Sequence, residues 1–186
     1  MKIRFMSGNK NKIQEVQRIL APIGVEVVPA SRKIEELQTQ DVDALVHDKL
    51  IKAFREIGRP LFVEHTGLYL RGLNDLPAGL TQIFWDRLEA ERFTDLVAAL
   101  GDNKVTATTV LGYCDGHKMH LFKGAIEGTV PRRPAGPKDF QWDCVFVPDG
   151  HTQTFAEMGT GKDNISMRRL ALDKFAAHLE AAKAKK

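Results

Sequence analysis

Two long β-rich segments joined by a tight turn constrain the fold of this chain more than any other feature. Residues 105–114 are rich in valine and threonine, residues 119–130 form a second extended segment, and Asp115-Gly116 between them is a strong hairpin signal. Helical patterns precede and follow this hairpin. The sequence therefore predicts an α/β fold with a long mixed central β-sheet flanked by helices, although the pairing order cannot be read from it.

The remaining elements are predicted from hydrophobic periodicity and from turn residues. We expect further strands at residues 3–6, 25–28, 61–63, 68–70 and 140–147. We expect helices after the turn at 7–10, from an N-cap at Asp41 to Gly58, over 80–100 with a break near Arg92, and from about Ser166 onward. No linker or internal repeat divides the chain, so residues 1–186 are expected to form one domain.

Composition excludes several classes of protein. The chain has 186 residues and a net charge of +3, and Lys183, Lys185 and Lys186 contribute to that charge from the very end. The rest of the chain is near neutral, so a basic stripe for nucleic acid is not indicated. No apolar run is long enough for a membrane span, and the N-terminal residues lack an apolar signal core. Cys114 and Cys144 lack metal-ligand spacing and cannot build a disulfide framework, which favours the cytoplasm.

A polar loop between the first strand and the first helix is the first candidate site. It consists of Ser7, Gly8, Asn9, Lys10, Asn11 and Lys12. Free amides and the helix dipole at a helix N-terminus favour an anion, and the two lysines add positive charge. A solvated turn capped by asparagine explains the same residues, and the pattern alone leaves both interpretations open.

Lys49 is unusual because it lies in the apolar stripe of its predicted helix, beside Val46 and Leu50. Most lysines in such positions bury the stem and keep the ammonium in water. The alternative is that the ammonium enters a cleft and meets an anionic ligand. Taken alone, the position favours the first interpretation.

Acidic residues are expected near the ends of several elements. Glu36 lies in a polar loop and Glu64 follows a predicted strand, whereas Asp143 lies within an apolar segment and would need a partner if buried. Carboxylates gathered in this way suit Mg²⁺, a hard cation that prefers oxygen ligands. Arg168 begins its predicted helix, against the preference of the helix dipole, so its charge is expected to have another purpose.

Taken together and in order, these segments resemble the inosine triphosphate pyrophosphatase family over nearly the whole chain. The matching segments are Ser7-Gly8-Asn9, Glu36-Leu37-Gln38, Lys49, Val63-Glu64-His65-Thr66-Gly67-Leu68, Leu76-Pro77, Phe140-Gln141-Trp142-Asp143, Phe155-Ala156-Glu157-Met158, Lys162 and Ser166-Met167-Arg168. Each motif is weak by itself, whereas their order and spacing together are specific.

The resemblance implies two lobes around a nucleotide-binding cleft, usually in a homodimer. It also implies metal-dependent hydrolysis of non-standard purine nucleoside triphosphates to the monophosphate and pyrophosphate, with Mg²⁺ expected and Mn²⁺ as the alternative. The implied metal ligands are Glu36, Glu64 and His65, and the implied catalytic residues are Glu64, His65 and Asp143. The implied substrate-binding residues are Ser7, Gly8, Asn9, Lys10, Lys12, Lys49, Phe140, Gln141, Trp142, Asp143, Lys162, Ser166, Met167 and Arg168.

Four residues depart from the family pattern. His65 replaces an aspartate that helps to bind metal, Met167 replaces a histidine, Gln141 replaces a glycine and Gln82 stands where the eukaryotic members have lysine. Imidazole is a poorer Mg²⁺ ligand than carboxylate. We therefore expect altered base specificity or a weakened metal site. Two alternatives stay open: a nucleotide-binding or sensing protein that hydrolyses weakly or not at all, and a nucleic-acid-binding module that uses the basic tail.

Overall fold

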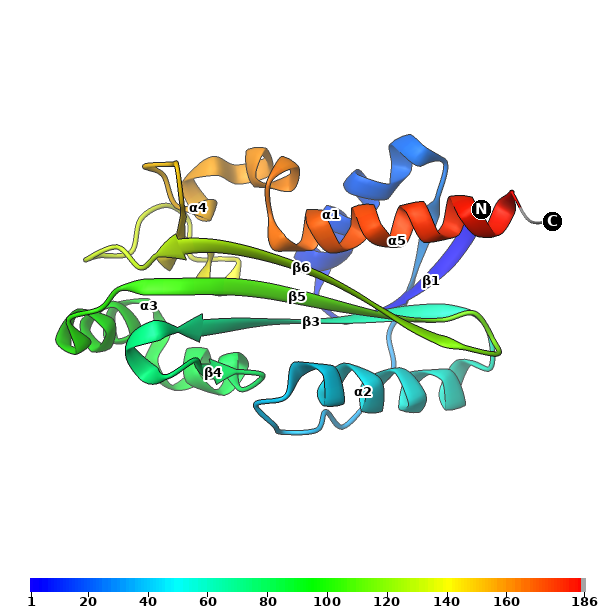
Figure 1. Ribbon diagram of the computed structural model, residues 1–186, viewed down its shortest axis with the longest axis horizontal. Coiled ribbons are helices and arrows are strands. Elements are labelled where there is room, and N and C mark those ends of the chain that lie inside the picture. The colour runs from blue at the N-terminus through cyan, green and yellow to red at the C-terminus, as the bar shows by residue number, and fades with distance from the viewer. Residues whose placement is uncertain (185–186) are drawn as a thin grey trace.

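A long antiparallel hairpin forms the centre of the molecule. The computed structural model describes residues 1–184. Strands β5 (Lys104–Cys114) and β6 (Met119–Thr129) pair along their whole length, and the side chain of Asp115 accepts backbone hydrogen bonds in the connecting turn. Figure 1 shows both strands crossing the molecule along its longest axis. The hairpin predicted from the sequence is confirmed.

The sheet contains parallel and antiparallel pairs, as predicted. Its order is β2 (Glu26–Ala30), β1 (Lys2–Met6), β3 (Leu61–Leu70), β5, β6 and β7 (Val147–Pro148), with β4 (Leu76–Ala78) paired to β3 outside this path. Strand β1 runs parallel to β2 and β3, whereas the other pairs are antiparallel. This arrangement confirms a mixed α/β sheet and places the end of β1 beside the first residues of β3.

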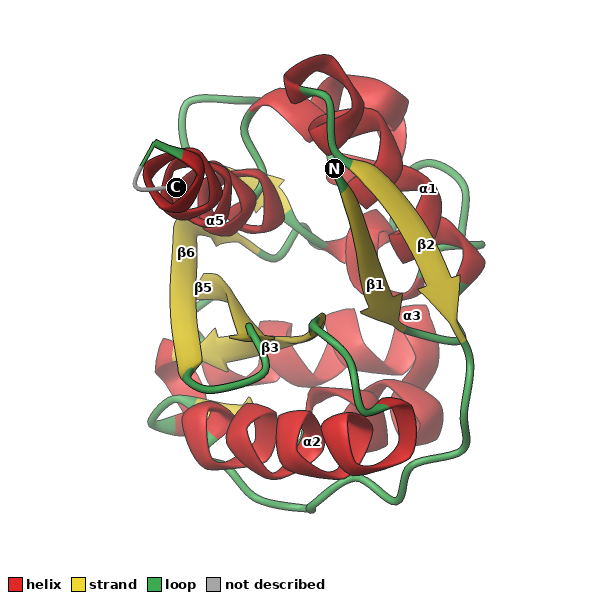
Figure 2. Ribbon diagram, turned by 90° about the vertical axis from the view of Figure 1, so that its right-hand side faces the viewer, coloured by secondary structure: helices red, strands yellow, loops and turns green. Residues whose placement is uncertain are grey.

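Helices cover both faces of this sheet. The α-helices are α1 (Lys10–Leu20), α2 (Val42–Ile57), α3 (Thr81–Leu100), α4 (Phe155–Met158) and α5 (Met167–Lys183). The short 3₁₀ helices are η1 (Ala21–Ile23), η2 (Arg71–Leu73), η3 (Gln141–Val145) and η4 (Gly159–Asn164). Figures 1 and 2 show α5 on one face of the sheet and α2 on the other. Asp41 caps α2 and Ser166 caps α5, as the sequence predicts.

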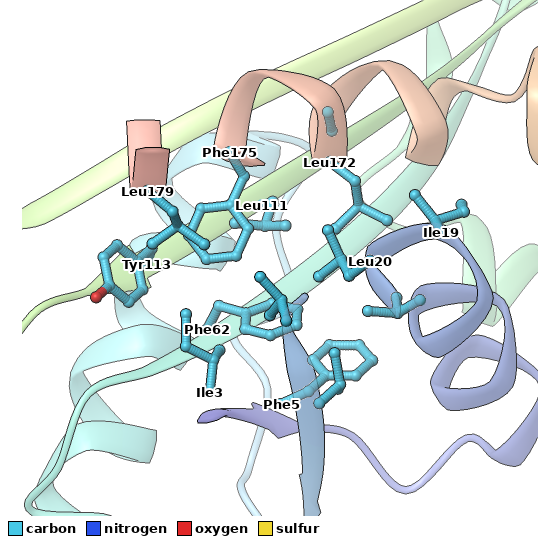
Figure 3. Packing of buried hydrophobic residues seen from close by; sticks show 14 residues of the cluster. Ile3, Phe5, Ile19, Leu20, Phe62, Leu111, Tyr113, Leu172, Phe175 and Leu179 are labelled. Atoms are coloured by element: carbon cyan, nitrogen blue, oxygen red, sulfur yellow. The ribbon is translucent and has the colours of Figure 1, made fainter. Parts of the chain in front are cut away.

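An aromatic cluster joins the two helices of one face to the sheet. The rings of Phe5 and Phe62 stack with centroids 4.5 Å apart, and Phe175 of α5 lies 5.3 Å from Phe62. Figure 3 shows Leu172, Phe175 and other α5 side chains pointing toward these strand residues. Burial of this apolar surface is what holds α1 and α5 on the sheet.

Two further clusters complete the core. One lies under α2 and includes Leu45, Val46 and Leu50 against β3 and β5. The other lies at the far end of the hairpin, where α3, η3 and α4 meet; its buried residues include Phe93 and Phe146. The aromatic cluster and the α2 cluster therefore lie on opposite faces of the same long strands.

The segment predicted as a strand over residues 140–147 folds differently. Residues Gln141–Val145 form η3, and only Val147–Pro148 belong to the sheet. Gln141 has a φ of 47°, which interrupts extended backbone. Trp142 to Phe146 are all buried, and an apolar run without alternation fits a buried helical turn as well as a strand. The prediction was therefore wrong, and Asp143 lies on a helical turn.

Two other boundaries differ from the predictions. Glu64 and His65 do not follow a short strand but lie inside the ten-residue β3, which pairs with β5 along its whole length. The strand is buried on both faces, so Glu64 and Thr66 pair with side chains from other elements, whereas Nε2 of His65 has no hydrogen-bond partner in the described part of the chain. The break in α3 falls at Glu89, where φ is 55°, rather than near Arg92.

No helix among residues 1–184 is both long and apolar enough to cross a membrane. Lys185 and Lys186, which belong to the predicted basic tail, lie outside the described residues.

Candidate active site

A cleft of about 370 Å³ opens where β1, β3, α2, α3 and η3 approach one another. Its lining brings together residues that are far apart in the sequence: Met6, Ser7, Gly8, Asn9, Lys12, Arg32, Ile34, Glu36, Lys49, Glu64, His65, Thr66, Thr81, Gln82, Trp85, Gln141 and Trp142. Most of the sequence-predicted site residues are among them. Cavities of this size are typical of small-ligand sites.

The polar loop after β1 forms one wall of the cleft. The side chain of Asn9 caps α1 by accepting a hydrogen bond from the Lys12 amide at 3.1 Å, and Ser7 Oγ accepts one from the Asn9 amide at 3.2 Å. These bonds hold the loop in a fixed turn, with the positive end of the α1 dipole beside the cleft. Lys12 lines the cleft, whereas Lys10 is exposed and does not.

Lys49 reaches the cleft from α2. Its Nζ donates to Glu36 Oε1 at 2.5 Å and to the carbonyl oxygen of Glu64 at 3.3 Å, and its side chain is 13% exposed. The ammonium therefore faces the cleft instead of extending into bulk water. Although burial by itself raises the pKa of Glu36, the charge of Lys49 holds that pKa below its usual value.

Glu64 is buried in the floor of the cleft and is fully engaged by cations. Arg168 Nε donates to Glu64 Oε2 at 2.7 Å and Arg168 Nη2 donates to Oε1 at 3.2 Å, while Lys12 Nζ lies 3.0 Å from Oε1. Burial opposes ionisation, but the charges of Arg168 and Lys12 hold the pKa of Glu64 far below its usual value. Glu64 is therefore an ionised carboxylate at neutral pH.

His65 lies beside Glu64 in β3 and lines the cleft. Burial, together with the positive charges of Lys12 and Lys49, lowers the pKa of His65 to about 4. Its Nδ1 lies 3.9 Å from Glu36 Oε2, and its buried Nε2 has no hydrogen-bond partner in the described structure. The imidazole is therefore neutral at pH 7, and one of its nitrogens is unsatisfied.

A second, smaller pocket lies behind η3, and we call it the side pocket. It measures about 290 Å³ and its lining includes Phe140, Asp143, Phe155 and Lys162. Lys162 Nζ lies 3.9 Å from the centre of the Phe140 ring and forms a buried ion pair with Asp143. Gln141 and Trp142 line the cleft instead, so η3 separates the two cavities.

A buried chain of alternating charges connects the cleft with the side pocket. It runs through Lys12, Glu64, Arg168, Glu15, Lys162 and Asp143. Arg168 Nη1 donates to Glu15 Oε2 at 2.7 Å, and Lys162 Nζ lies 3.5 Å from the same oxygen. Each buried charge therefore has an opposite charge beside it, as a low-dielectric interior requires. Arg168, the second residue of α5, completes this chain, which accounts for a positive charge at the start of the helix.

Glu15 was missed by the sequence reasoning. It lies one turn before Ile19 on the buried stripe of α1 and is 0% exposed. The available signal was the same as for Lys49, a charged residue at a helical position that faces the core. Arg32, Thr81 and Trp85 also line the cleft without having been predicted.

Four predicted binding residues line neither cavity: Lys10, Ser166, Met167 and Arg168. Ser166 caps α5 through the Arg169 amide, and Met167 is 1% exposed within the cluster that contains Phe146 and Phe155. Arg168 is buried between the cavities. Asp143, predicted to act beside Glu64, lies on the side-pocket face of η3. The sequence motif around residue 167 therefore contributes packing and capping at these positions.

Among the described residues, no group of three or more histidine, cysteine, aspartate or glutamate side chains is arranged to hold a metal ion. The two oxygens of Glu64 already accept from Arg168 and Lys12. Glu36 keeps one oxygen that faces His65 rather than a lysine. Glu36 is therefore the carboxylate in the cleft that is best placed to meet a cation.

Comparisons with known proteins agree on one family. A family model described as the Ham1 family matches residues 3–178. The dITP/XTP pyrophosphatase of Methanopyrus kandleri is 33% identical over 178 residues, which covers 95% of both chains. The inosine triphosphate pyrophosphatase of Yarrowia lipolytica is 35% identical over 182 residues, which covers 96% of both chains.

Solved structures show the same fold. The Ham1 protein of Staphylococcus aureus superposes with a TM-score of 0.80 at 21% identity, covering 98% of this chain and 100% of its own. A HAM1 protein from Coxiella burnetii gives a TM-score of 0.79 at 23% identity, covering 97% and 99%. At these identities the superpositions establish the arrangement of the sheet and helices.

Proposed function

The chain belongs to the Ham1 family, and on that premise we propose that it hydrolyses a nucleoside triphosphate to the monophosphate and pyrophosphate. One observation of the site carries the proposal. The N-terminus of α1 and the ammonium groups of Lys12 and Lys49 converge on the cleft and form what we call its phosphate wall. Such a wall suits a polyphosphate, because amide dipoles and fixed positive charges both favour an anion.

The reaction is a displacement at the α-phosphorus. A bond forms between the oxygen of a water molecule and this phosphorus while the water releases a proton to solvent, and the bond to the α–β bridging oxygen breaks, so pyrophosphate leaves with that oxygen. His65, neutral at pH 7, is suited to align the water through a ring nitrogen. Lys12 and Lys49 are suited to stabilise negative charge that develops on the phosphate oxygens.

A divalent ion forms part of the proposal, with Mg²⁺ expected and Mn²⁺ as the alternative. Proteins usually bind Mg²⁺ through one or two carboxylates together with substrate phosphates, so a site without three protein ligands fits an ion that enters with the nucleotide. Glu36 and His65 would hold it, because Glu64 is occupied by Arg168 and Lys12. When bound, the ion supplies charge neutralisation on the phosphate oxygens.

The base is proposed to occupy the side pocket, where Phe140 offers a ring face and Asp143 and Lys162 offer polar groups. Non-standard purines are the first candidates, because the relatives compared above are named for inosine and xanthosine nucleotides. Gln141, which lines the cleft where the family pattern has glycine, supports an altered base range.

The proposal also includes assembly as a homodimer and a location in the cytoplasm. A homodimer is supported by β6, whose outer edge pairs only at Gly128 and Thr129 within the described chain and carries the exposed Met119 and Leu121. Light scattering of the purified protein tests this assembly. The reducing cytoplasm is supported by the free thiols of both cysteines. No role for nucleic acid is proposed.

A nucleotide panel tests the reaction. The protein is incubated with ITP, XTP, their deoxy forms and the standard triphosphates, with Mg²⁺ and separately with Mn²⁺, and pyrophosphate and phosphate are assayed independently. Release of pyrophosphate from at least one nucleotide is expected. Release of phosphate alone shows that another bond is cut, and binding without any product over hours shows a nucleotide-binding protein instead of an enzyme.

A further inference from the structure

Two glutamines meet across the mouth of the cleft. Gln82 lies on the first turn of α3 and Gln141 begins η3, 59 positions apart in the sequence. Gln141 Nε2 donates to Gln82 Oε1 at 2.5 Å, and both side chains line the cleft. Both positions also depart from the pattern of the family that the sequence resembles. The two departures are therefore one contact, which we call the clasp.

The hydrogen bonds fix the orientation of both amides. Gln82 Nε2 donates to Asp86 Oδ1 at 2.6 Å, and an ionised carboxylate can only accept. The oxygen of Gln82 must therefore face Gln141, which in turn presents its nitrogen to Gln82. Oε1 of Gln141 accepts no hydrogen bond within the described part of the chain, so the clasp offers one free acceptor.

The backbone of Gln141 is strained in the conformation that places this side chain in the clasp. Its φ of 47° lies in the left-handed region, where residues other than glycine are strained. Glycine at this position would remove the strain but also the amide. Strained residues persist where the surroundings hold them, and they gather at sites that bind ligands.

The position of the clasp indicates which part of a ligand it meets. Phe140 and Asp143 of the same segment line the side pocket, whereas Trp142 lines the cleft. With phosphates at Lys12 and the base in the side pocket, the sugar passes Gln141. This step rests on the proposed function.

We propose that the clasp of Gln82 and Gln141 selects the sugar: Oε1 of Gln141 accepts a hydrogen bond from the 2′-hydroxyl, so the protein favours ribonucleotides over deoxyribonucleotides. With a deoxyribonucleotide, which lacks the 2′-hydroxyl, Oε1 of Gln141 can accept a hydrogen bond only from water. One such hydrogen bond to the ligand is worth roughly 2- to 10-fold in specificity. The side chain of Gln82 is a positioning residue, because it sets the rotation of the Gln141 amide.

The test compares kcat/KM for ITP and dITP in the wild-type protein and in four variants. Gln141→Gly and Gln141→Ala remove the amide, Gln82→Ala removes its support, and the double variant Gln82→Ala/Gln141→Ala removes both. The control is Asn74→Gly, which relieves a left-handed residue with a φ of 50° outside the cleft.

The ratio of kcat/KM for ITP to kcat/KM for dITP is expected to be roughly 2 to 10 in the wild type. We expect a ratio near 1 in all four clasp variants and the wild-type ratio in the control. The double variant is expected to match the single variants, since the two residues act as one unit. Gln141→Gly is expected to raise the melting temperature by about 2–4 °C through relief of strain, which separates lost selectivity from lost folding.

A wild-type ratio of 1, a preference for dITP, or clasp variants that keep the wild-type ratio would overturn the proposal. If no nucleotide yields pyrophosphate, the proposed function fails and the clasp is judged by calorimetric affinities for ITP and dITP. The same ratio in binding supports the clasp, whereas equal affinities or no binding of either nucleotide overturn it.

Discussion

Arg168 donates two hydrogen bonds to the carboxylate of Glu64, from Nε at 2.7 Å and from Nη2 at 3.2 Å, and both side chains are almost completely buried. Arg168→Ala leaves Glu64 and Glu15 without their shared cation. Breaking a buried ion pair in this way is expected to lower the free energy of unfolding by about 3–5 kcal/mol. Urea denaturation followed by circular dichroism measures it.

Arg169→Ala is the matched control, because Arg169 occupies the next position of α5 but pairs with Asp173 on the surface. Loss of such an exposed i,i+4 pair is expected to cost about 0.3–0.5 kcal/mol. If both variants lower the free energy of unfolding equally, the buried charge chain stabilises the protein no more than an exposed ion pair does.

The sequence predicted those residues of the site whose role can be inferred from neighbouring residues in the chain. Asp41 was predicted as a cap and Lys49 as an unusual residue in an apolar stripe, because each signal lies within a few residues. The pairing of Lys49 with Glu36 could not be predicted because Glu36 lies in an irregular loop, and that of Arg168 with Glu15 because 153 positions separate them. Only tertiary packing decides which buried charges become neighbours.

The segment around Asp143 shows a different limit. Its consecutive apolar residues fit a buried strand and a buried helical turn equally well, and periodicity cannot separate the two. The deciding feature is the left-handed backbone of Gln141, which no sequence rule assigns to glutamine. The side pocket behind η3 could therefore not be predicted from the sequence pattern, although the resemblance to a known family had indicated its residues as substrate-binding.

Close packing of α5 on the hairpin predicts an effect at Gly124. A Cβ there would lie 2.1 Å from the Met167 carbonyl oxygen and 2.6 Å from the Ala171 amide nitrogen, both backbone atoms. Gly124→Ala is expected to lower the free energy of unfolding by at least about 1–3 kcal/mol through overpacking. Gly161→Ala, where a Cβ meets open space, is the control and should change stability by less than about 0.5 kcal/mol. A tolerated Gly124→Ala would mean that α5 is free to move away from β6.

The hairpin turn predicts a pH effect. Hydrogen bonds from the backbone amides of Lys118 and His117 lower the pKa of Asp115 from 3.8 to about 2. A lowered folded-state pKa stabilises the protein above the unfolded value, and this contribution is lost as the pH falls from about 3.8 toward 2. The carboxylate is partly exposed, so the contribution is about 1 kcal/mol or less.

Asp115→Asn removes this titration while keeping an acceptor for the turn. We expect the difference in melting temperature between wild type and Asp115→Asn to be greatest above pH 4 and to shrink as the pH falls toward 2. A difference that stays constant across this range would show that the charge of Asp115 does not stabilise the turn.

Lys49 and Lys52 allow a matched test of the proposed phosphate wall. Lys49 contacts Glu36 and the Glu64 carbonyl inside the cleft, whereas Lys52, one turn further along α2, pairs with Asp48 outside it. Lys49→Ala is expected to raise KM for the nucleoside triphosphate roughly 10-fold or more, the loss of one charge-assisted hydrogen bond. Lys52→Ala is expected to leave KM within about 2-fold. Steady-state pyrophosphate release measures both, and equal effects would remove Lys49 from the phosphate wall.

His65→Asp tests whether the imidazole weakens the proposed metal site or has a role of its own. A carboxylate here would add an oxygen ligand beside Glu36, so Mg²⁺-supported turnover is expected to rise, with an apparent Mg²⁺ affinity on the order of 10-fold higher. Pyrophosphate release against Mg²⁺ concentration measures this, and circular dichroism checks folding. His47→Asp, on the exposed face of α2, controls for added negative charge. No gain, or a loss, with the fold intact would show that alignment of the water by the imidazole outweighs the oxygen ligand that aspartate adds.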